Sequence, residues 1–135
     1  DELGLGAAVE WIASEVNTKY GLECRVEWND TLPEQPEFST ELFRIVQESI
    51  NNAIKHSGAS RLDILFSRTA RSITLEISDN GRGFTPGKRS APNRSFGIIG
   101  MRERAKALGG SLDISSTRNR GTTLILKIGD PGEGA

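Results

Sequence analysis

The chain has 135 residues, with 17 basic against 18 acidic side chains and a formal net charge of −1. This length suits one domain with one core, and the balanced charge excludes a global field that would favour nucleic acid or a membrane surface. The single cysteine, Cys24, excludes an internal disulfide or a cysteine metal cluster, and no apolar run approaches the roughly 20 residues that span a bilayer, so we expect a cytoplasmic domain.

A first amphipathic helix is predicted over 3–20, followed by a strand over 24–28. Apolar residues recur along the helix at spacings of three and four: Leu5, Val9, Ile12 and Val16. Gly21 is a stop signal for the helix, and the strand alternates in polarity. Because the chain opens with DELGLG so close to this helix, we expect it to be a fragment of a longer protein.

A second helix is predicted to begin at a cap formed by Ser39 or Thr40 and to end near Ser57, with Gly58 after it. Its apolar positions form one broad stripe that should face the core: Leu42, Phe43, Val46, Ile50, Ala53 and Ile54.

The polar residues of this helix, within ESINNAIKHS, are not scattered. At about 100° per residue, Glu48, Asn52 and Lys55 fall together on nearly the opposite face, whereas Asn51 lies on another side and is expected to be structural or peripheral. A solvated helix face would explain the stripe, but an acid, an amide and an amine in line would also suit a binding site.

The rest of the chain is predicted to alternate strand pairs with one helix. Alternating strands over 61–68 and 72–79 are joined by a link short enough for a hairpin. A Gly/Pro/Ser-rich segment follows, and then a helix over 99–108. Strands over 111–117 and 122–128 come last, and the tail 129–135 is expected to be disordered.

This order of elements predicts one α/β (α+β) two-layer sandwich over 1–128. Helices should cover one face of a mixed, mostly antiparallel sheet. The other face of the sheet then needs either polar side chains or a partner.

The segment DNGRGF, which directly follows a strand, is a candidate ligand site. Asp79 would lie at the strand's end, with Gly81 and Gly83 allowing close approach of the backbone to a ligand. A carboxylate there could accept a hydrogen bond from an exocyclic amine such as that of adenine. An ordinary Asp-Asn-Gly turn would leave the same pattern.

A second glycine pair, Gly97 and Gly100, is expected just before the helix over 99–108. Free N–H groups and the helix dipole at a helix N-terminus favour phosphate. The alternative is that both glycines are merely loop and helix-start residues.

Taken in order, ESINNAIKH, DNGRGF, FGIIGMRERA and RGTT resemble the nucleotide-binding boxes of the GHKL superfamily. The chain resembles the catalytic ATP-binding (HATPase_c) domain of bacterial two-component sensor histidine kinases, within the short-lid NarL/DesK-like subfamily. The resemblance covers essentially the whole chain. It implies the Bergerat fold, binding of ATP with Mg²⁺, and transfer of the γ-phosphoryl group to a histidine on a separate dimerisation domain.

The resemblance also implies roles for the second helix. Asn52 matches the asparagine that binds Mg²⁺, and Glu48 would reach the metal through water or polarise a nearby water. Lys55 and His56 would lie near the phosphates or the ribose.

For the remaining boxes, Asp79 matches the aspartate that binds the adenine amino group, together with Gly81 and Gly83. Thr122 matches a threonine at the adenine end of the site. The second glycine box, which ends the lid and cradles the phosphates, comprises these residues: Gly97, Ile99, Gly100 and Met101. The lid itself would span 85–96, with three cations that either meet phosphate or only add solubility: Lys88, Arg89 and Arg94.

The only histidine, His56, lies inside the first box and is expected to belong to the nucleotide site rather than to accept the phosphoryl group. The resemblance therefore implies an acceptor domain of the same kinase as partner, a response regulator acting through that domain, and a monomeric isolated domain. The full-length protein could be anchored to a membrane. Two alternatives remain: a GHKL serine kinase or ATPase, and a non-catalytic docking module that keeps the fold.

Overall fold

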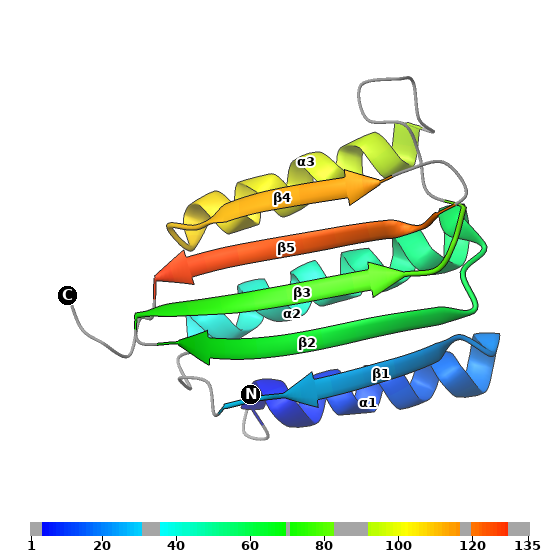
Figure 1. Cartoon of the computed structure of the whole chain (residues 1–135), viewed down its shortest axis with the longest axis horizontal. Coiled ribbons are helices and arrows are strands. Elements are labelled where there is room, and N and C mark those ends of the chain that lie inside the picture. Colours follow the sequence, from blue (N-terminus) through cyan, green and yellow to red (C-terminus); the bar gives the residue numbers. More distant parts are fainter. Residues whose placement is uncertain (1–3, 31–35, 70, 83–91, 117–119, 130–135) are drawn as a thin grey trace.

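The computed structural model describes residues 4–30, 36–69, 71–82, 92–116 and 120–129, and for 56–57 and 92–96 it describes the backbone only. Helices and strands follow one another in this order (Figure 1): α1 Gly4–Tyr20, β1 Glu23–Trp28, α2 Pro36–Asn52, a π-helical turn η1 Ala53–Ser57, β2 Arg61–Thr69, β3 Ser72–Asp79, α3 Pro92–Ala107, β4 Ser111–Ser116 and β5 Thr122–Gly129.

The five strands form one sheet in the order β1-β2-β3-β5-β4. β1 runs parallel to β2, and every other neighbouring pair is antiparallel. All three α-helices lie on the same side of the sheet (Figure 1). The predicted sandwich, with its mixed and mostly antiparallel sheet, is therefore confirmed.

The core lies between the sheet and the helices. Alternate residues of the central strands point into it, as in Leu62, Ile64 and Phe66 of β2, because side chains on a strand alternate between its two faces. α1 and α2 cover these residues with apolar stripes, and Trp28 of β1 stacks on Phe66 with ring centroids 4.1 Å apart. One continuous apolar cluster thus holds the two layers together.

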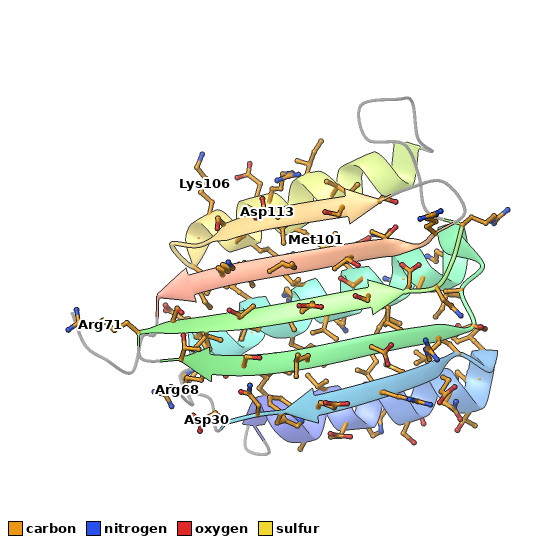
Figure 2. The ribbon with its side chains drawn as sticks, in the orientation of Figure 1. Asp30, Arg68, Arg71, Met101, Lys106 and Asp113 are labelled. Carbon is orange, nitrogen blue, oxygen red and sulfur yellow. The ribbon has the colours of Figure 1, made fainter. Side chains whose placement is uncertain are left out.

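The opposite face of the sheet is mostly polar. In β3, Thr74, Glu76 and Ser78 alternate with buried residues, so they lie on this face. Asp113 of β4 is exposed and can be found on the sheet in Figure 2. Of the two alternatives for this face, polar side chains or a partner, the structure has polar side chains.

α2 begins earlier than predicted, at Pro36, so Ser39 and Thr40 are not its caps but lie inside the helix. Proline suits the first helical position because its missing N–H has no partner there in any case. Ile45, which was not placed in the predicted apolar stripe, is fully buried, whereas Phe43 is only partly buried. The predicted stop at Gly58 is confirmed, since this residue is left-handed at φ 60° and closes the π-turn.

α3 also begins earlier than predicted, at Pro92 rather than at 99. At the other end of the chain, Gly129 is the last residue of β5 and pairs with Ser72, so the tail does not begin at 129. Residues 130–135 lie outside the described part. No described helix has both the length and the apolarity needed to cross a membrane.

Candidate functional site

A small cavity of about 30 Å³ lies between α2, α3 and the sheet. Two helices and four strands line it: Ser49 and Asn52 of α2, Leu62 of β2, Ile77 and Asp79 of β3, Ile98 and Met101 of α3, Ile114 of β4, and Thr122 and Leu124 of β5. The structure therefore brings four residues singled out in the sequence to one place: Asn52, Asp79, Met101 and Thr122. One carboxylate, one amide and hydroxyls in an aliphatic lining form the donor and acceptor set of a small-molecule site.

Asp79 is the last residue of β3 and pairs with Thr122 at the start of β5. Its Oδ1 accepts a hydrogen bond of 2.8 Å from the backbone N–H of Gly81, which is itself buried. This bond holds the carboxylate at the end of β3, beside the cavity. Gly83 lies outside the described residues, so only one of the two predicted glycines of this box can be placed.

Only glycine fits at position 121, beside Asp79, although the sequence analysis did not assign Gly121 to the site. Its φ is 86°, and a Cβ added there would lie 2.1 Å from the backbone oxygen of Asp79. Only glycine combines that backbone conformation with so close an approach. The signal was present in the sequence, because Gly121 immediately precedes the predicted Thr122.

Asn80, in the same turn, is structural. Its Oδ1 accepts hydrogen bonds from the backbone N–H groups of Ser60 at 3.0 Å and Arg61 at 2.9 Å, and its Nδ2 donates to the Ser60 hydroxyl at 2.8 Å. These bonds tie the end of β3 to the start of β2. The turn residue between Asp79 and Gly81 therefore fixes the loop that presents the carboxylate.

Ser49 is a polar lining residue of the cavity that the sequence did not reveal. It is 8% exposed, and its Oγ lies 2.9 Å from the carbonyl oxygen of Ile45 and 3.7 Å from the sulfur of Met101. The first contact satisfies the hydroxyl inside α2, and the second places α3 against α2. On the opposite side, the hydroxyl of Thr122 lies 2.9 Å from that of Ser116.

Glu48 does not line this cavity. It lines a polar hollow of about 530 Å³ between α2 and α3, together with Asn51, Arg44 and Gln47, and Met101 lines both this hollow and the cavity. Glu48 and Asn52, one turn apart on α2, thus line different hollows, and Asn51 lines the one that contains Glu48. The two asparagines point into different hollows because consecutive helical residues are rotated by about 100°.

The next residues of the first box lie in the π-turn η1. Lys55 is exposed and lines neither hollow, and the side chain of His56 lies outside the described part. A π-turn at the end of a helix changes the direction of the side chains that follow it, and such turns are frequent at functional sites.

The second glycine box differs from its prediction. Gly97 and Gly100 lie inside α3, beyond the first four residues whose N–H groups lack a helical partner, and not just before the helix. Ile99 is 56% exposed, and its neighbour Ile98 lines the cavity instead.

Gly97 has a clear packing role. A Cβ at this position would lie 2.3 Å from Oε2 of Glu48, so the glycine lets the carboxylate rest against the backbone of α3. Of the lid residues, Lys88 and Arg89 lie outside the described part, as does the side chain of Arg94.

Residues 38–131 match the family described as histidine kinase-, DNA gyrase B-, and HSP90-like ATPase. Two curated relatives are similar over much of this chain. DegS, a signal transduction histidine-protein kinase/phosphatase of Bacillus subtilis, is 37% identical over 94 residues, which are 69% of this chain and 24% of DegS. NreB, an oxygen sensor histidine kinase of Staphylococcus carnosus, is 31% identical over 129 residues, which are 95% of this chain and 37% of NreB.

Solved structures agree. The blue-light activated histidine kinase of Erythrobacter litoralis EL346 matches with a TM-score of 0.73 and 26% identity, over 95% of this chain and 46% of that one. A histidine kinase domain from the same protein matches with a TM-score of 0.72 over 96% of this chain and 63% of the other, at 21% identity. The chain thus spans only part of every relative named here.

Proposed function

Because the chain belongs to the family of histidine kinase-, DNA gyrase B-, and HSP90-like ATPases, we propose that it binds ATP with Mg²⁺ and donates the γ-phosphoryl group to a histidine on a separate dimerisation domain. It has the ATP-binding domain of sensor histidine kinases, as DegS, NreB and the Erythrobacter kinase do. The reaction and the partner domain are proposals for the full-length protein.

The observation that carries this proposal is the position of Asp79. Its carboxylate ends β3 at an aliphatic cavity whose other polar side chains include Asn52 and Thr122. A carboxylate in such a place accepts a hydrogen bond from an exocyclic amino group, which adenine has and guanine does not present at the same ring position. Aliphatic residues such as Ile77 and Leu124, which lie side by side on the sheet, suit one face of a purine ring.

For the metal, we propose that the side-chain oxygen of Asn52 ligates Mg²⁺ and that Glu48 acts through water from the neighbouring hollow. Mg²⁺ favours oxygen ligands and bridges phosphates with few protein groups, where it neutralises charge. An amide oxygen supplies a ligand without adding negative charge beside a triphosphate. Lys55 and His56, in the π-turn, are proposed to lie near the phosphates.

For the acceptor, we propose a histidine outside this chain. The only histidine of this chain, His56, lies in the π-turn η1 that follows α2. In the proposed reaction an imidazole nitrogen of the acceptor forms a bond to the γ-phosphorus while the bond between that phosphorus and the leaving oxygen of ADP breaks. This chain's part is to position the phosphates and balance their charge.

The proposed setting follows from the same reaction. We propose that the isolated domain is monomeric and works in the cytoplasm, and that a response regulator receives the phosphoryl group from the acceptor domain. Any membrane attachment would belong to other parts of the full-length kinase.

The first test is calorimetric titration with a non-hydrolysable ATP analogue, with and without Mg²⁺, and with the corresponding GTP analogue. We expect saturable, adenine-selective and Mg²⁺-sensitive binding. Asp79→Asn should weaken it about tenfold or more, because the amide can present a donor where the carboxylate accepted.

Asp113→Asn is the matched control, because Asp113 is exposed on β4 and lies outside the cavity. Equal affinities of both variants and the wild type would contradict the site assignment. A wild-type chain that binds no nucleotide would instead favour a docking module.

A further inference from the structure

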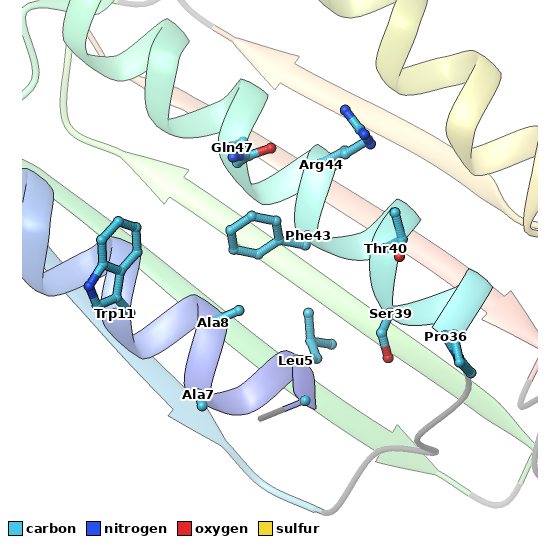
Figure 3. Close-up of a pocket in the computed structure, with 11 residues that line it drawn as sticks. Leu5, Ala7, Ala8, Trp11, Pro36, Ser39, Thr40, Phe43, Arg44 and Gln47 are labelled. Atoms are coloured by element: carbon cyan, nitrogen blue, oxygen red, sulfur yellow. The ribbon is translucent and has the colours of Figure 1, made fainter. Parts of the chain in front are cut away.

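An apolar groove of about 710 Å³ lies between α1 and α2, on the side of the helices that faces away from the sheet. Figure 3 shows Leu5, Ala8 and Trp11 of α1 along one wall, and Phe43 of α2 pointing between the two helices from the other. The nucleotide cavity lies on the opposite side of α2, and no residue lines both. The groove is therefore a separate surface.

Trp11 is the residue of this groove that folding does not explain. It is 63% exposed, whereas α1 packs on the core through other residues, Val9 and Val16 among them. A large exposed aromatic side chain beside an apolar groove is typical of an interaction surface, and tryptophan is enriched among the residues that dominate binding energies.

The groove leads toward the proposed reaction centre. Arg44 and Gln47 of α2 line it and also line the polar hollow that contains Glu48 and Gly97. One continuous track therefore runs from the start of α1 to the carboxylate that we place near the metal.

The charged residue in the lining of the groove is a cation, Arg44. The groove has no acidic lining residue, and within the described residues Arg44 has no carboxylate partner. Arg104, in the adjoining hollow, is already paired with Glu41 at 2.9 Å. The hollow that Arg44 also lines does contain Glu48. The positive charge of Arg44 beside Trp11 and Phe43 fits an occupant with an apolar stripe and an acidic residue.

We propose that this track binds an amphipathic helix of the histidine-bearing domain, with its apolar stripe on Trp11 and Phe43 and an acidic residue on Arg44. This inference rests on the proposed function. The kinases DegS and NreB are much longer than their matches to this chain, which are 24% and 37% of their lengths. An amphipathic helix in an apolar groove is a common recognition mode, and here the end of the groove would bring an acceptor histidine toward Glu48.

The test uses phosphotransfer from ATP to the histidine-bearing domain of the same kinase, supplied as a separate protein. Trp11→Ala should raise the KM for that domain about tenfold or more while the affinity for the ATP analogue stays unchanged. Tyr20→Ala is the matched control, because Tyr20 is an aromatic residue of the same helix, 61% exposed, and does not line the groove.

A second pair of variants tests the charge. Arg44→Glu should also raise this KM and make it less sensitive to salt, whereas Lys19→Glu, which reverses an exposed charge on α1 outside the groove, should not. In a Trp28→Phe background, tryptophan emission reports Trp11 alone and should shift to shorter wavelength when the histidine-bearing domain is added without nucleotide.

Three outcomes would overturn the inference. One is an equal KM for Trp11→Ala and Tyr20→Ala. Another is a loss of nucleotide affinity in Trp11→Ala that accounts for its phosphotransfer defect. The third is a wild-type dimer that Trp11→Ala dissociates without changing the KM, because the occupant would then be a second copy of this chain. If the wild type binds no ATP, the proposed function fails, and the fluorescence titration still tests the groove.

Discussion

At the scale of single residues, the neighbouring asparagines Asn51 and Asn52 have different surroundings. Asn52 lines the cavity that contains Asp79, and Asn51 lines the hollow that contains Glu48. Sequence position alone would allow either to serve a ligand, but only Asn52 shares a cavity with the adenine-binding candidate.

Asn52→Asp should weaken binding of the Mg²⁺-bound ATP analogue about tenfold, because it adds a negative charge beside the triphosphate and alters the metal shell. Asn51→Asp introduces the same charge one residue earlier and should change the affinity much less. Calorimetry of both variants with and without Mg²⁺ makes the comparison. An effect of Asn51→Asp as large as that of Asn52→Asp would contradict the assignment of the metal to Asn52.

The residues of the site that motifs could predict are those whose chemistry is explicit. Asp79 and Thr122 were predicted at the end and the start of two strands. That these strands are neighbours and pair the two residues comes from the structure, because α3 and β4 separate them in the chain. Ile99 was the predicted site residue, but Ile98 lines the cavity. This difference could not be predicted, because it depends on where α3 begins. An error in that start of a few residues, at about 100° each, changes which side chain faces the cavity.

At the scale of elements, α3 is held against α2 by a contact that requires glycine. Gly97 and Gly100 are both inside α3, but a Cβ at Gly97 would meet Glu48 at 2.3 Å, and a Cβ at Gly100 would meet nothing within 4 Å. The same substitution should therefore have different effects at the two positions.

Gly100→Ala should raise the free energy of unfolding by about 0.5–1 kcal/mol, because alanine loses less backbone entropy than glycine in a helix. Gly97→Ala should raise the free energy of unfolding much less, because the side chain of Glu48 has to move. Urea denaturation measures both, and Glu48→Ala should restore the gain at Gly97 in a double-mutant cycle. Equal gains in the two single variants would show that Glu48 does not hold α3.

Element boundaries were predicted less well than element types. Every strand and every helix was predicted where apolar periodicity is strong, and the left-handed stop at Gly58 was predicted from its glycine. The start of α2 was missed because Ser39 and Thr40 are good caps, although Pro36 also suits a first helical position. The π-turn after Asn52 has no sequence signal, because it depends on packing against the sheet.

At the scale of the whole molecule, Cys24 links stability to pH. Burial, with smaller contributions from Asp63 and Glu10, raises the pKa of the Cys24 thiol from 9.0 to about 11. Between these values the unfolded chain loses the thiol proton while the folded protein keeps it. This contribution to stability is therefore complete below pH 9 and is lost as the pH rises toward 11.

Urea denaturation at about pH 8 and about pH 10 should show a smaller pH-dependent loss of stability in Cys24→Ala than in the wild type. Other titrating groups are common to both proteins, so the difference isolates the thiol. The same shift predicts slow alkylation of Cys24 in the folded protein, because the thiolate is the reactive form. If the stability of the wild type and of Cys24→Ala changed equally with pH, the raised pKa of Cys24 would be contradicted.

The small volume of the cavity gives a further prediction. At about 30 Å³ it is far below the roughly 300–1,000 Å³ of ligand pockets, so Ile98 and Met101 of α3 would have to move to admit a purine. Ile98→Ala should therefore strengthen binding of the ATP analogue about threefold or more while it lowers the free energy of unfolding by about 1–3 kcal/mol. Ile99→Ala, at the exposed neighbour, should change neither. Weaker nucleotide binding in Ile98→Ala would show that this side chain supports the ligand instead.

The position of α3 makes ATP affinity a measure of conformational population. If only a fraction of molecules has α3 displaced far enough to admit a purine, the apparent dissociation constant equals the intrinsic one divided by that fraction. Any part of a kinase that holds α3 in the displaced position would then tighten ATP binding without touching the nucleotide. By the same linkage, bound ATP would strengthen that distant contact by an equal factor, so the helix that closes the cavity could carry a signal in both directions.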